Sequence, residues 1–455
     1  MKSIPFFILM AYLFLCLQNN LGVAAPEIVG ATGLIVILIG MGLVINDKSG
    51  NGWSPTIIMA FAAVFRLMFL WRTPELSDDI FRYIFDGMMT VSGHNPYALA
   101  PANVLPSSPQ MHGLISQVNH PHLITIYPPA AQLVFALGCF TGGVFGMKLV
   151  LVLFDLATCG VIIKLLTHLR LPVSHAALYA WHPLPVIETG ASGHIDATAV
   201  FFLLSAFLII LSTSNSKKAA DPTQTGSPAT GCFPFAAGVI ISFSIFTKWM
   251  PVIFLPCFLI IAFPKKRRHV FSGILITSAI LLLLFLPDFT NSLNTLTTYL
   301  QRWEFSGYLF RNLREMTGSG KTARLICVSL FMAVSGMVYV QIFLKNHPVA
   351  LFKGCYVIAF AFLILTPTLH PWYALYLAAF LPFAGGPAGL VFSWSVFLSY
   401  RVMMAYGLTG QWVETGGVPL WVVSAPAAAA GVSIILKFLN GKAINSNSRR
   451  ANPEL

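Results

Sequence analysis

The sequence has few charged side chains, and acidic ones are the scarcest. Only 9% of its 455 residues are charged, with 15 acidic residues against 27 basic ones, whereas soluble globular proteins carry about 25% charged residues. Hydrophobic residues make up 56% of the chain, and the mean hydropathy is +0.77. This composition argues against a soluble enzyme, a nucleic-acid-binding protein and a disordered scaffold. It predicts a polytopic membrane protein.

Several sequence signatures are also missing. The seven cysteines are scattered through mostly apolar stretches without a C-x-x-C pair, so neither a disulfide framework nor a zinc site is indicated. Neither a P-loop nor a Rossmann fingerprint is present, and no internal repeat suggests the two-halved plan of many transporters. The net charge of +12 fits the Lys and Arg residues that collect in cytoplasmic loops, so no nucleic-acid partner is expected.

Long apolar stretches run through the whole chain. We predict an all-α protein in which residues 1–455 form a single polytopic membrane domain of about 12–14 transmembrane helices. Residues 1–25 fit either a cleaved signal peptide or a first span. Residues 128–142 are too short to span and end in Thr141-Gly142-Gly143, which predicts a re-entrant or surface helix. The expected spans are residues 5–20, 27–45, 53–70, 145–166, 173–190, 194–213, 233–247, 250–263, 270–287, 323–343, 349–367, 374–386, 388–406 and 419–438.

Basic loops orient these spans. The run Lys265-Lys266-Arg267-Arg268 is the firmest cytoplasmic marker. It predicts a flexible cytoplasmic loop at 214–232 and a cytoplasmic tail at 440–455. The polar segments then expected outside the membrane are a first long loop at 71–127, a second loop at 288–320, and the shorter segments 368–373 and 407–418.

The first external loop holds an unusual share of the acidic residues. Four of the 15 fall within twelve residues: Glu75, Asp78, Asp79 and Asp86. A helix capped by Ser77 would place four candidate side chains on one face: Asp79, Arg82, Tyr83 and Asp86. Adjacent carboxylates perturb each other's pKa, which favours a functional site. The alternative is a solvated helix held by pairs among Asp79, Arg82 and Asp86.

Three further segments carry polar residues at the expected outer ends of spans. His194 and Asp196 open an apolar helix, although Asp196 is equally explained as a favourable partner of the helix dipole. Lys248 interrupts an apolar stretch, where an anion such as a lipid phosphate would satisfy its charge; the alternative is a side chain that snorkels to the surface. Arg302 and Trp303 belong to the second external loop, which could instead lie on lipid headgroups.

In combination, these segments resemble GT-C-fold membrane glycosyltransferases. The resemblance covers residues 70–385 and is closest to bacterial polyprenyl-phosphate-mannose-dependent mannosyltransferases. It rests on six segments in order: Asp78-Asp79-Ile80-Phe81-Arg82-Tyr83, Gly93-His94-Asn95-Pro96-Tyr97, Tyr127-Pro128-Pro129, Gly193-His194-Ile195-Asp196-Ala197, Lys248-Trp249-Met250-Pro251 and Thr366-Pro367-Thr368-Leu369-His370-Pro371-Trp372-Tyr373. This family usually reaches its acidic loop after one span, whereas two or three spans precede the loop here.

The resemblance implies an inverting transfer of a hexose, expected to be mannose, from a polyprenyl-phosphate donor to a lipid- or glycan-linked acceptor hydroxyl. One of Asp78 and Asp79 would be the general base. Lys248 is the first choice for stabilising the departing phosphate, with Arg82 and Arg302 as weaker choices. The remaining residues of the expected substrate-binding set are Tyr83, Asp86, His194, Asp196, His370, Trp372 and Tyr373.

Other partners and the location follow from the same resemblance. Membrane lipids surround the chain, and the site would face the periplasm from the inner membrane if the source is bacterial. The sequence requires no cofactor, and no metal ligands are assigned. A divalent metal stays open only because the first loop also contains His94, His112, His120 and His122. The oligomeric state and the identity of the sugar are not fixed by the sequence.

A secondary transporter or lipid flippase is the alternative, because it also needs many spans and buried charges. Such a protein would place its charges near the bilayer midplane at broken helices. Here the acidic residues gather in the external loop 71–127, which favours chemistry at the membrane interface.

Overall fold

The computed structural model describes residues 3–49, 52–215, 229–262, 267–414 and 417–433. Within these ranges the protein consists of helices and loops without a named strand, which confirms the predicted all-α membrane fold. Among the described residues, six helices are long and apolar enough to cross a membrane, and six shorter apolar helices accompany them. Most of the predicted loop 214–232 and the whole predicted tail 440–455 lie outside the described residues.

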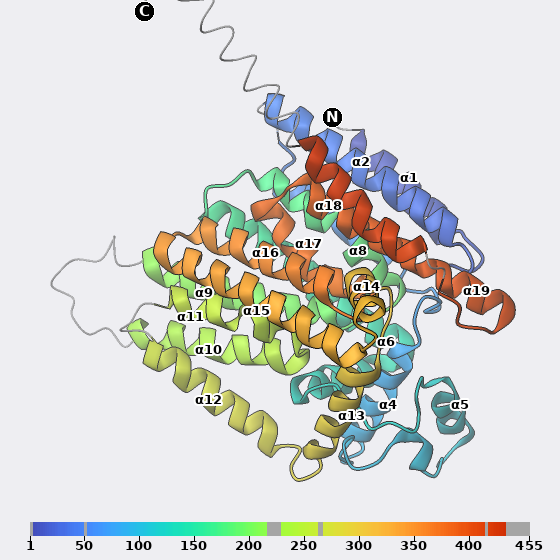
Figure 1. Cartoon of the computed structure of the whole chain (residues 1–455). Coiled ribbons are helices and arrows are strands. Elements are labelled where there is room, and N and C mark those ends of the chain that lie inside the picture. The colour runs from blue at the N-terminus through green and yellow to red at the C-terminus, as the bar shows by residue number, and fades with distance from the viewer. Residues whose placement is uncertain (1–2, 50–51, 216–228, 263–266, 415–416, 434–455) are drawn as a thin grey trace, which may run out of the picture.

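The helices form one bundle (Figure 1), with short helices gathered at one end. Those of the N-terminal half are α1 (Ile4–Cys16), α2 (Ala25–Ser49), α3 (Pro55–Leu67), α4 (Asp79–Val91), α5 (Pro109–Gln117), α6 (Pro129–His168), α7 (Ala177–Ala180), α8 (Pro183–Pro185) and α9 (Asp196–Asn215). Those that follow are α10 (Ala229–Thr247), α11 (Leu255–Ile261), α12 (Arg267–Leu283), α13 (Phe289–Arg302), α14 (Tyr308–Thr317), α15 (Gly320–Lys345), α16 (Pro348–Leu365), α17 (Leu375–Ala384), α18 (Pro387–Ser395) and α19 (Arg401–Thr409).

Helix α6 bends where the sequence predicted a break. Gly142 and Gly143 have non-helical backbone angles, with φ of 117° and 50°, which glycine adopts without steric cost. The arm before the bend packs closely on α4. A Cβ atom on Gly87 of α4 would lie 2.4 Å from the carbonyl oxygen of Phe135, so only glycine permits this approach.

The stretch 173–190 is not the single helix that we expected. It is divided into the 3₁₀ turn η2 (Val173–Ala176), α7, α8 and the π-helical turn η3 (Val186–Ala191). Pro183 and Pro185 lack the backbone N–H that a continuous helix would use. Most of this irregular stretch is buried inside the protein, where non-helical backbone is tolerated at membrane depth.

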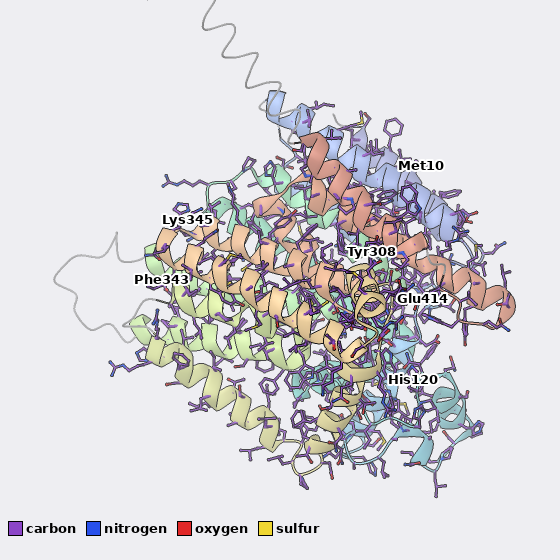
Figure 2. All side chains as sticks on the ribbon, in the orientation of Figure 1. Met10, His120, Tyr308, Phe343, Lys345 and Glu414 are labelled. Carbon is purple, nitrogen blue, oxygen red and sulfur yellow. The ribbon has the colours of Figure 1, made fainter. Side chains whose placement is uncertain are left out.

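The four segments predicted to lie outside the membrane meet at the same end of the bundle. Figure 2 shows His120, Tyr308 and Glu414 at this end, and Lys345 at the opposite end. Residues 305–306 pair with Thr368 through isolated β-bridges, and Arg311 forms an ion pair with Glu414. The structure therefore brings 71–127, 288–320, 368–373 and 407–418 together.

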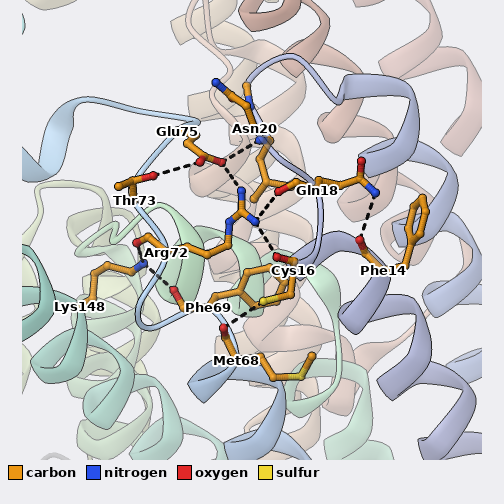
Figure 3. Close-up of polar contacts among 12 residues, drawn as sticks. Phe14, Cys16, Gln18, Asn20, Met68, Phe69, Arg72, Thr73, Glu75 and Lys148 are labelled. Atoms are coloured by element: carbon orange, nitrogen blue, oxygen red, sulfur yellow. Dashed lines mark hydrogen bonds and ion pairs between the residues drawn. The ribbon is translucent and has the colours of Figure 1, made fainter.

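A charged network fixes the segment that leads into the first external loop (Figure 3). Arg72 donates hydrogen bonds to the carbonyl oxygens of Cys16 and Gln18, both at 2.6 Å, and pairs with Glu75 at 2.6 Å. Lys148 of α6 donates to the carbonyl oxygens of Phe69 and Arg72 at 2.7 and 2.8 Å. These contacts tie the α1–α2 turn and α6 to the chain just before α4.

A buried ion pair joins α3 to α6 within the bundle. Arg66 and Asp155 are fully buried, with Nε and Oδ2 2.7 Å apart. Tyr179 donates to the other oxygen of Asp155 at 2.7 Å, and Arg66 donates to the carbonyl oxygen of Ala180 at 2.8 Å. A buried pair with such partners fixes the relative position of its helices, and losing one member is costly.

Candidate active site

Asp79 is oriented by two side chains from later in the first external loop. It begins α4, and its Oδ1 accepts a hydrogen bond from the Asn119 amide at 2.8 Å. Its Oδ2 accepts one from the Tyr127 hydroxyl at 3.2 Å. The side chain remains 20% exposed, so an incoming hydroxyl group could still reach it. The carboxylate is therefore oriented without being closed off.

Asp78 differs from Asp79 in its exposure and in its hydrogen bonding. Its side chain is exposed and makes no cap hydrogen bond at the start of α4. Partial desolvation and the negative charge of Asp79 raise the pKa of Asp78. The two candidates for a general base are thus adjacent in sequence, but only Asp79 is oriented by side chains from elsewhere in the fold.

Lys248 turns toward the same site and pairs with Asp196. Its Nζ lies 3.1 Å from Asp196 Oδ2, 5.1 Å from the centre of the Tyr127 ring and 5.9 Å from that of Tyr373. Asp196 is fully buried, whereas the Lys248 side chain is 16% exposed. The alternative of a lysine that snorkels to the surface is wrong, because the ammonium group is held among the site residues.

Tyr127 contacts both the carboxylate and the cation. Its hydroxyl donates to Asp79 while its ring faces the ammonium group of Lys248. The ring packs edge-on against Tyr83 at a centroid distance of 4.9 Å, and the two hydroxyls are 3.2 Å apart. The Tyr97 hydroxyl donates to the Tyr127 carbonyl oxygen at 2.7 Å. A rigid aromatic side chain thus sets the spacing of the two charged groups.

Four stacked rings form one wall of the site. Trp372 lies between His194 and His370, at centroid distances of 3.8 and 4.3 Å with nearly parallel planes. Phe305 stacks on the other face of His370 at 4.8 Å. Burial lowers the pKa of His370 to about 3, so this imidazole is neutral. The stacked row is therefore mostly apolar in character.

Backbone contacts with the second external loop hold this wall in place. The Phe305 N–H donates to the Pro367 carbonyl oxygen at 3.0 Å, and the Leu369 N–H donates back to the Phe305 carbonyl oxygen at 2.7 Å. The Tyr299 and Tyr373 hydroxyls are 2.5 Å apart. The segment 366–373 is thereby fixed against the loop 288–320.

A left-handed glycine presents His194 to the site. Gly193 has φ of +78°, and a Cβ atom at this position would lie 2.7 Å from Ile80 of α4. The His194 ring is fully buried, and its Nδ1 lies 3.8 Å from Asp79 Oδ2. The turn that precedes α9 therefore places the imidazole directly beside the first residue of α4.

Some sequence candidates lie away from this group. Arg82 is buried and donates to the carbonyl oxygen of His120 at 3.0 Å. Asp86 is fully buried and accepts from Gln132 at 3.4 Å. The alternative of a solvated helix held by Asp79, Arg82 and Asp86 is therefore wrong. Arg302 lies exposed at the end of α13, and Tyr83 acts on the site through Tyr127.

Two site residues, Glu188 and Asn119, were missed from the sequence, and only Glu188 carried a signal. Glu188 is a fully buried acid inside the apolar stretch 173–190, and Tyr400 donates to its two oxygens at 2.8 and 2.9 Å. An ionisable residue at such a position indicates function by default, so Glu188 could have been found. Asn119 carries no comparable signal, because an amide in a polar loop is ordinary.

The histidines of the first loop do not gather around a common point. His120 packs against Trp303 at 5.0 Å and against His122 at 6.1 Å. Burial and the neighbouring His122 lower the pKa of His120. No group of three or more His, Cys, Asp or Glu side chains arranged to hold a metal ion occurs among the residues that the structure describes.

Comparison with known families identifies the chain. Residues 8–264 match the family described as alpha-(1->6)-mannopyranosyltransferase, N-terminal domain. The chain belongs to this family. It is thus a membrane mannosyltransferase of the GT-C type, and the transporter alternative is set aside. Searches of curated proteins and of solved structures gave no match.

The matched region contains only part of the site. It includes Asp79, Tyr127, Asp196 and Lys248, whereas the stacked segment 370–373 lies beyond residue 264. The wall of rings is therefore built by a part of the chain outside the matched domain.

Proposed function

We propose that this mannosyltransferase takes mannose from a polyprenyl-phosphate donor and transfers it to a lipid- or glycan-linked acceptor hydroxyl on the outer face of the membrane. A bacterial source would place it in the inner membrane with the site facing the periplasm. The observation that carries this proposal is that Asp79 and Lys248 both contact Tyr127, Asp79 at its hydroxyl and Lys248 over its ring.

Asp79 is proposed as the general base. Its carboxylate is oriented by Asn119 and Tyr127 and remains partly exposed, so it is placed to receive the proton of an acceptor hydroxyl. That oxygen would attack the anomeric carbon while the bond to the donor phosphate breaks. Attack from the side opposite the phosphate inverts the anomeric centre in a single displacement.

Lys248 is proposed to stabilise the departing phosphate. Asp196 takes one of its N–H donors at 3.1 Å, which leaves two donors on the ammonium group for phosphate oxygens. The leaving group is already an anion, so a fixed cation suffices and no protonating acid is required. The row formed by His194, Trp372 and His370 would border the sugar with the edges of its rings, because the ring faces stack on one another.

Substitution of the two adjacent aspartates tests this assignment. Asp79→Asn removes the base and is expected to lower the transfer rate by about 10²–10⁴-fold. Asp78→Asn removes an exposed carboxyl and is expected to change the rate by no more than about threefold. Both variants would be assayed with polyprenyl-phosphate mannose and membrane acceptors, and wild-type transfer by Asp79→Asn would refute the assignment.

A donor screen tests which sugar is transferred, independently of the mechanism. Labelled polyprenyl-phosphate mannose, glucose, galactose and arabinose would be offered to the same membranes. Consumption of the mannose donor alone is the expected result. Consumption of none of the four donors would contradict the proposed donor class.

A further inference from the structure

A buried acid behind the site has no partner of opposite charge. Glu188 belongs to the π-helical turn η3 and is fully buried. The Tyr400 hydroxyl donates to it at 2.8 and 2.9 Å. In the described part of the chain, its only ion-pair contact is with His194, whose Nε2 lies 3.5 Å from Glu188 Oε2.

The His194 ring stands between two carboxyl groups. Its Nε2 faces Glu188, and its Nδ1 lies 3.8 Å from Asp79 Oδ2. Both ring nitrogens are buried, and neither has a hydrogen-bond partner. The backbone N–H of His194 donates to the Glu188 carbonyl oxygen at 2.8 Å, and Trp372 stacks on the ring. The imidazole is therefore held in one plane, with a carboxyl group at each edge.

Burial decides the protonation of Glu188. A carboxylate taken out of water without a cation is strongly disfavoured, so such a group keeps its proton. The groups that face it are Tyr400, His194 and the acidic Asp196. Tyr400 and a neutral His194 bring no positive charge, and Asp196 disfavours a second negative charge. The protonated carboxyl then has one O–H to donate and a carbonyl oxygen to accept.

The two His194 contacts, at 3.8 and 3.5 Å, are not yet hydrogen bonds, but a single direction of hydrogen bonding would satisfy every group in this row once they shorten. Tyr400 donates to the carbonyl oxygen of Glu188, and the O–H of Glu188 donates to Nε2 of His194. A neutral imidazole that accepts at Nε2 carries its proton on Nδ1. That N–H points to Asp79, which is the only member of the row left ionised. Small movements within the site would shorten the two long contacts on binding of substrate.

We propose that Glu188 is a positioning residue of the transferase: its protonated carboxyl fixes His194 in the tautomer that donates from Nδ1 to Asp79. The inference rests on the proposed function of Asp79 as the base. The third donor completes the set formed with Asn119 and Tyr127, and it keeps the carboxylate ionised and oriented until the acceptor hydroxyl arrives. An acid of this kind acts through its neighbour and does not touch the substrate.

Replacement by the amide tests the proposal sharply. In Glu188→Gln, the amide N–H donates to His194 and the amide oxygen accepts from Tyr400, so the protonated acid is imitated. Transfer at neutral pH is expected within about threefold of wild type. Glu188→Ala leaves buried polar groups unsatisfied and is expected to lower transfer by about 10–100-fold. Glu27→Gln, at an exposed residue of α2, is the matched control.

The pH profile distinguishes positioning from a merely structural role. Raising the pH ionises Glu188 and removes its O–H, so wild-type kcat/KM is expected to fall at alkaline pH. Glu188→Gln cannot ionise and should lose this alkaline decline. An amide variant as inactive as Glu188→Ala would overturn the proposal, and so would an unchanged alkaline decline.

Failure of this inference is separable from failure of the proposed function. Wild-type activity in Asp79→Asn would refute the base assignment and, with it, the role of Glu188. Loss of activity in Asp79→Asn together with wild-type rates and pH profiles in both Glu188 variants would refute only the role of Glu188. If Glu188→Ala does not fold, the pH profile of Glu188→Gln still decides the question.

Discussion

The carboxyl groups near the site occupy three different environments. Asp79 is partly exposed and receives neutral hydrogen bonds. Asp196 is buried but neutralised by Lys248. Asp86 and Glu188 are buried without a lysine or arginine bonded to them in the described structure. Environment, more than residue type, therefore separates the chemical behaviour of these carboxyl groups.

The environment of Asp86 predicts a pH-dependent stability. Burial raises its pKa from 3.8 to about 6, although Arg82 acts in the opposite direction. Between these two pH values the folded protein binds more protons than the unfolded chain, so stability falls as the pH rises through this window. At about 1.4 kcal/mol per pKa unit, the ionised group costs roughly 3 kcal/mol above pH 6.

Asp86→Asn should therefore stabilise the protein at pH 7.5 by up to roughly 3 kcal/mol and have little effect at pH 4. Thermal unfolding in detergent at the two pH values would measure the difference. Glu315→Gln makes the same chemical change at an exposed residue of α14 and serves as the control. Equal effects of Asp86→Asn at both pH values would contradict the prediction.

At the residue scale, the sequence indicated which segments contribute to the site but not how they pair. Scarcity of charge made Asp79 and Lys248 conspicuous. The ion pair between Lys248 and Asp196 depends on the relative position of α9 and α10. Neither segment of sequence determines that position alone. The buried acids Glu188 and Asp155 could have been singled out, because a charge inside an apolar stretch is costly unless it is paired or functional.

Close helix packing positions the site at the scale of elements. Helix α4 carries Asp79 at its first residue and lies against the first arm of α6, which follows Tyr127 directly. Gly87 permits the contact, because any side chain there would meet the Phe135 carbonyl oxygen. The base and its tyrosine partner are thus held by one helix pair.

Gly87→Ala is expected to separate α4 from α6. The added Cβ would lie 2.4 Å from a backbone oxygen that cannot rotate away, and such overpacking typically costs about 1–3 kcal/mol. Gly113→Ala in α5 is the control, because a Cβ there meets nothing within 4 Å, and alanine should stabilise the helix by about 0.5–1 kcal/mol. Thermal unfolding and transfer assays of both variants would measure these effects.

A second outcome is expected from the same pair of variants. Movement of α4 displaces Asp79 from Asn119 and Tyr127, so Gly87→Ala should lose more activity than its change in stability explains. Wild-type activity in Gly87→Ala would show that the α4–α6 contact does not position the base.

The ends of helices were predicted correctly where the length of an apolar run and the position of glycines agreed. The bend at Gly142 and Gly143 was expected from the polar, small residues that end the apolar run. The stretch 173–190 was misjudged, because its hydropathy resembles that of a span while Pro183 and Pro185 divide it into short turns. A high hydropathy predicts that a segment is buried, but it does not distinguish a segment buried inside the protein from one buried in lipid.

Two opposite ends define the protein at the scale of the whole molecule. The predicted external segments meet at one end, and Lys345 lies at the other (Figure 2). The basic residues predicted this arrangement through their expected cytoplasmic location. The grouping of the external segments in space does not depend on the basic residues, because it comes from contacts such as those between Phe305 and the segment 367–369.

Cysteine labelling can test the orientation of the two ends. In a background in which the exposed Cys232 is replaced by serine, Leu105→Cys and Met316→Cys should react with an impermeant maleimide from the outer side. Leu344→Cys should react only from the cytoplasmic side. The three native side chains are 92%, 82% and 74% exposed on the surface of the protein. Reaction of Leu105→Cys and Leu344→Cys from the same side would contradict the topology.

The stacked wall also bears on how the protein is made. Asp79 is synthesised early, whereas Trp372 and Tyr400 follow only after most of the chain has been translated. At about 5–20 residues per second, the interval is on the order of tens of seconds. During that time the nascent chain carries Asp79 without the ring that stacks on His194 and without the hydroxyl that binds Glu188. The arrangement of the candidate site can therefore be completed only after the last of these segments has been made.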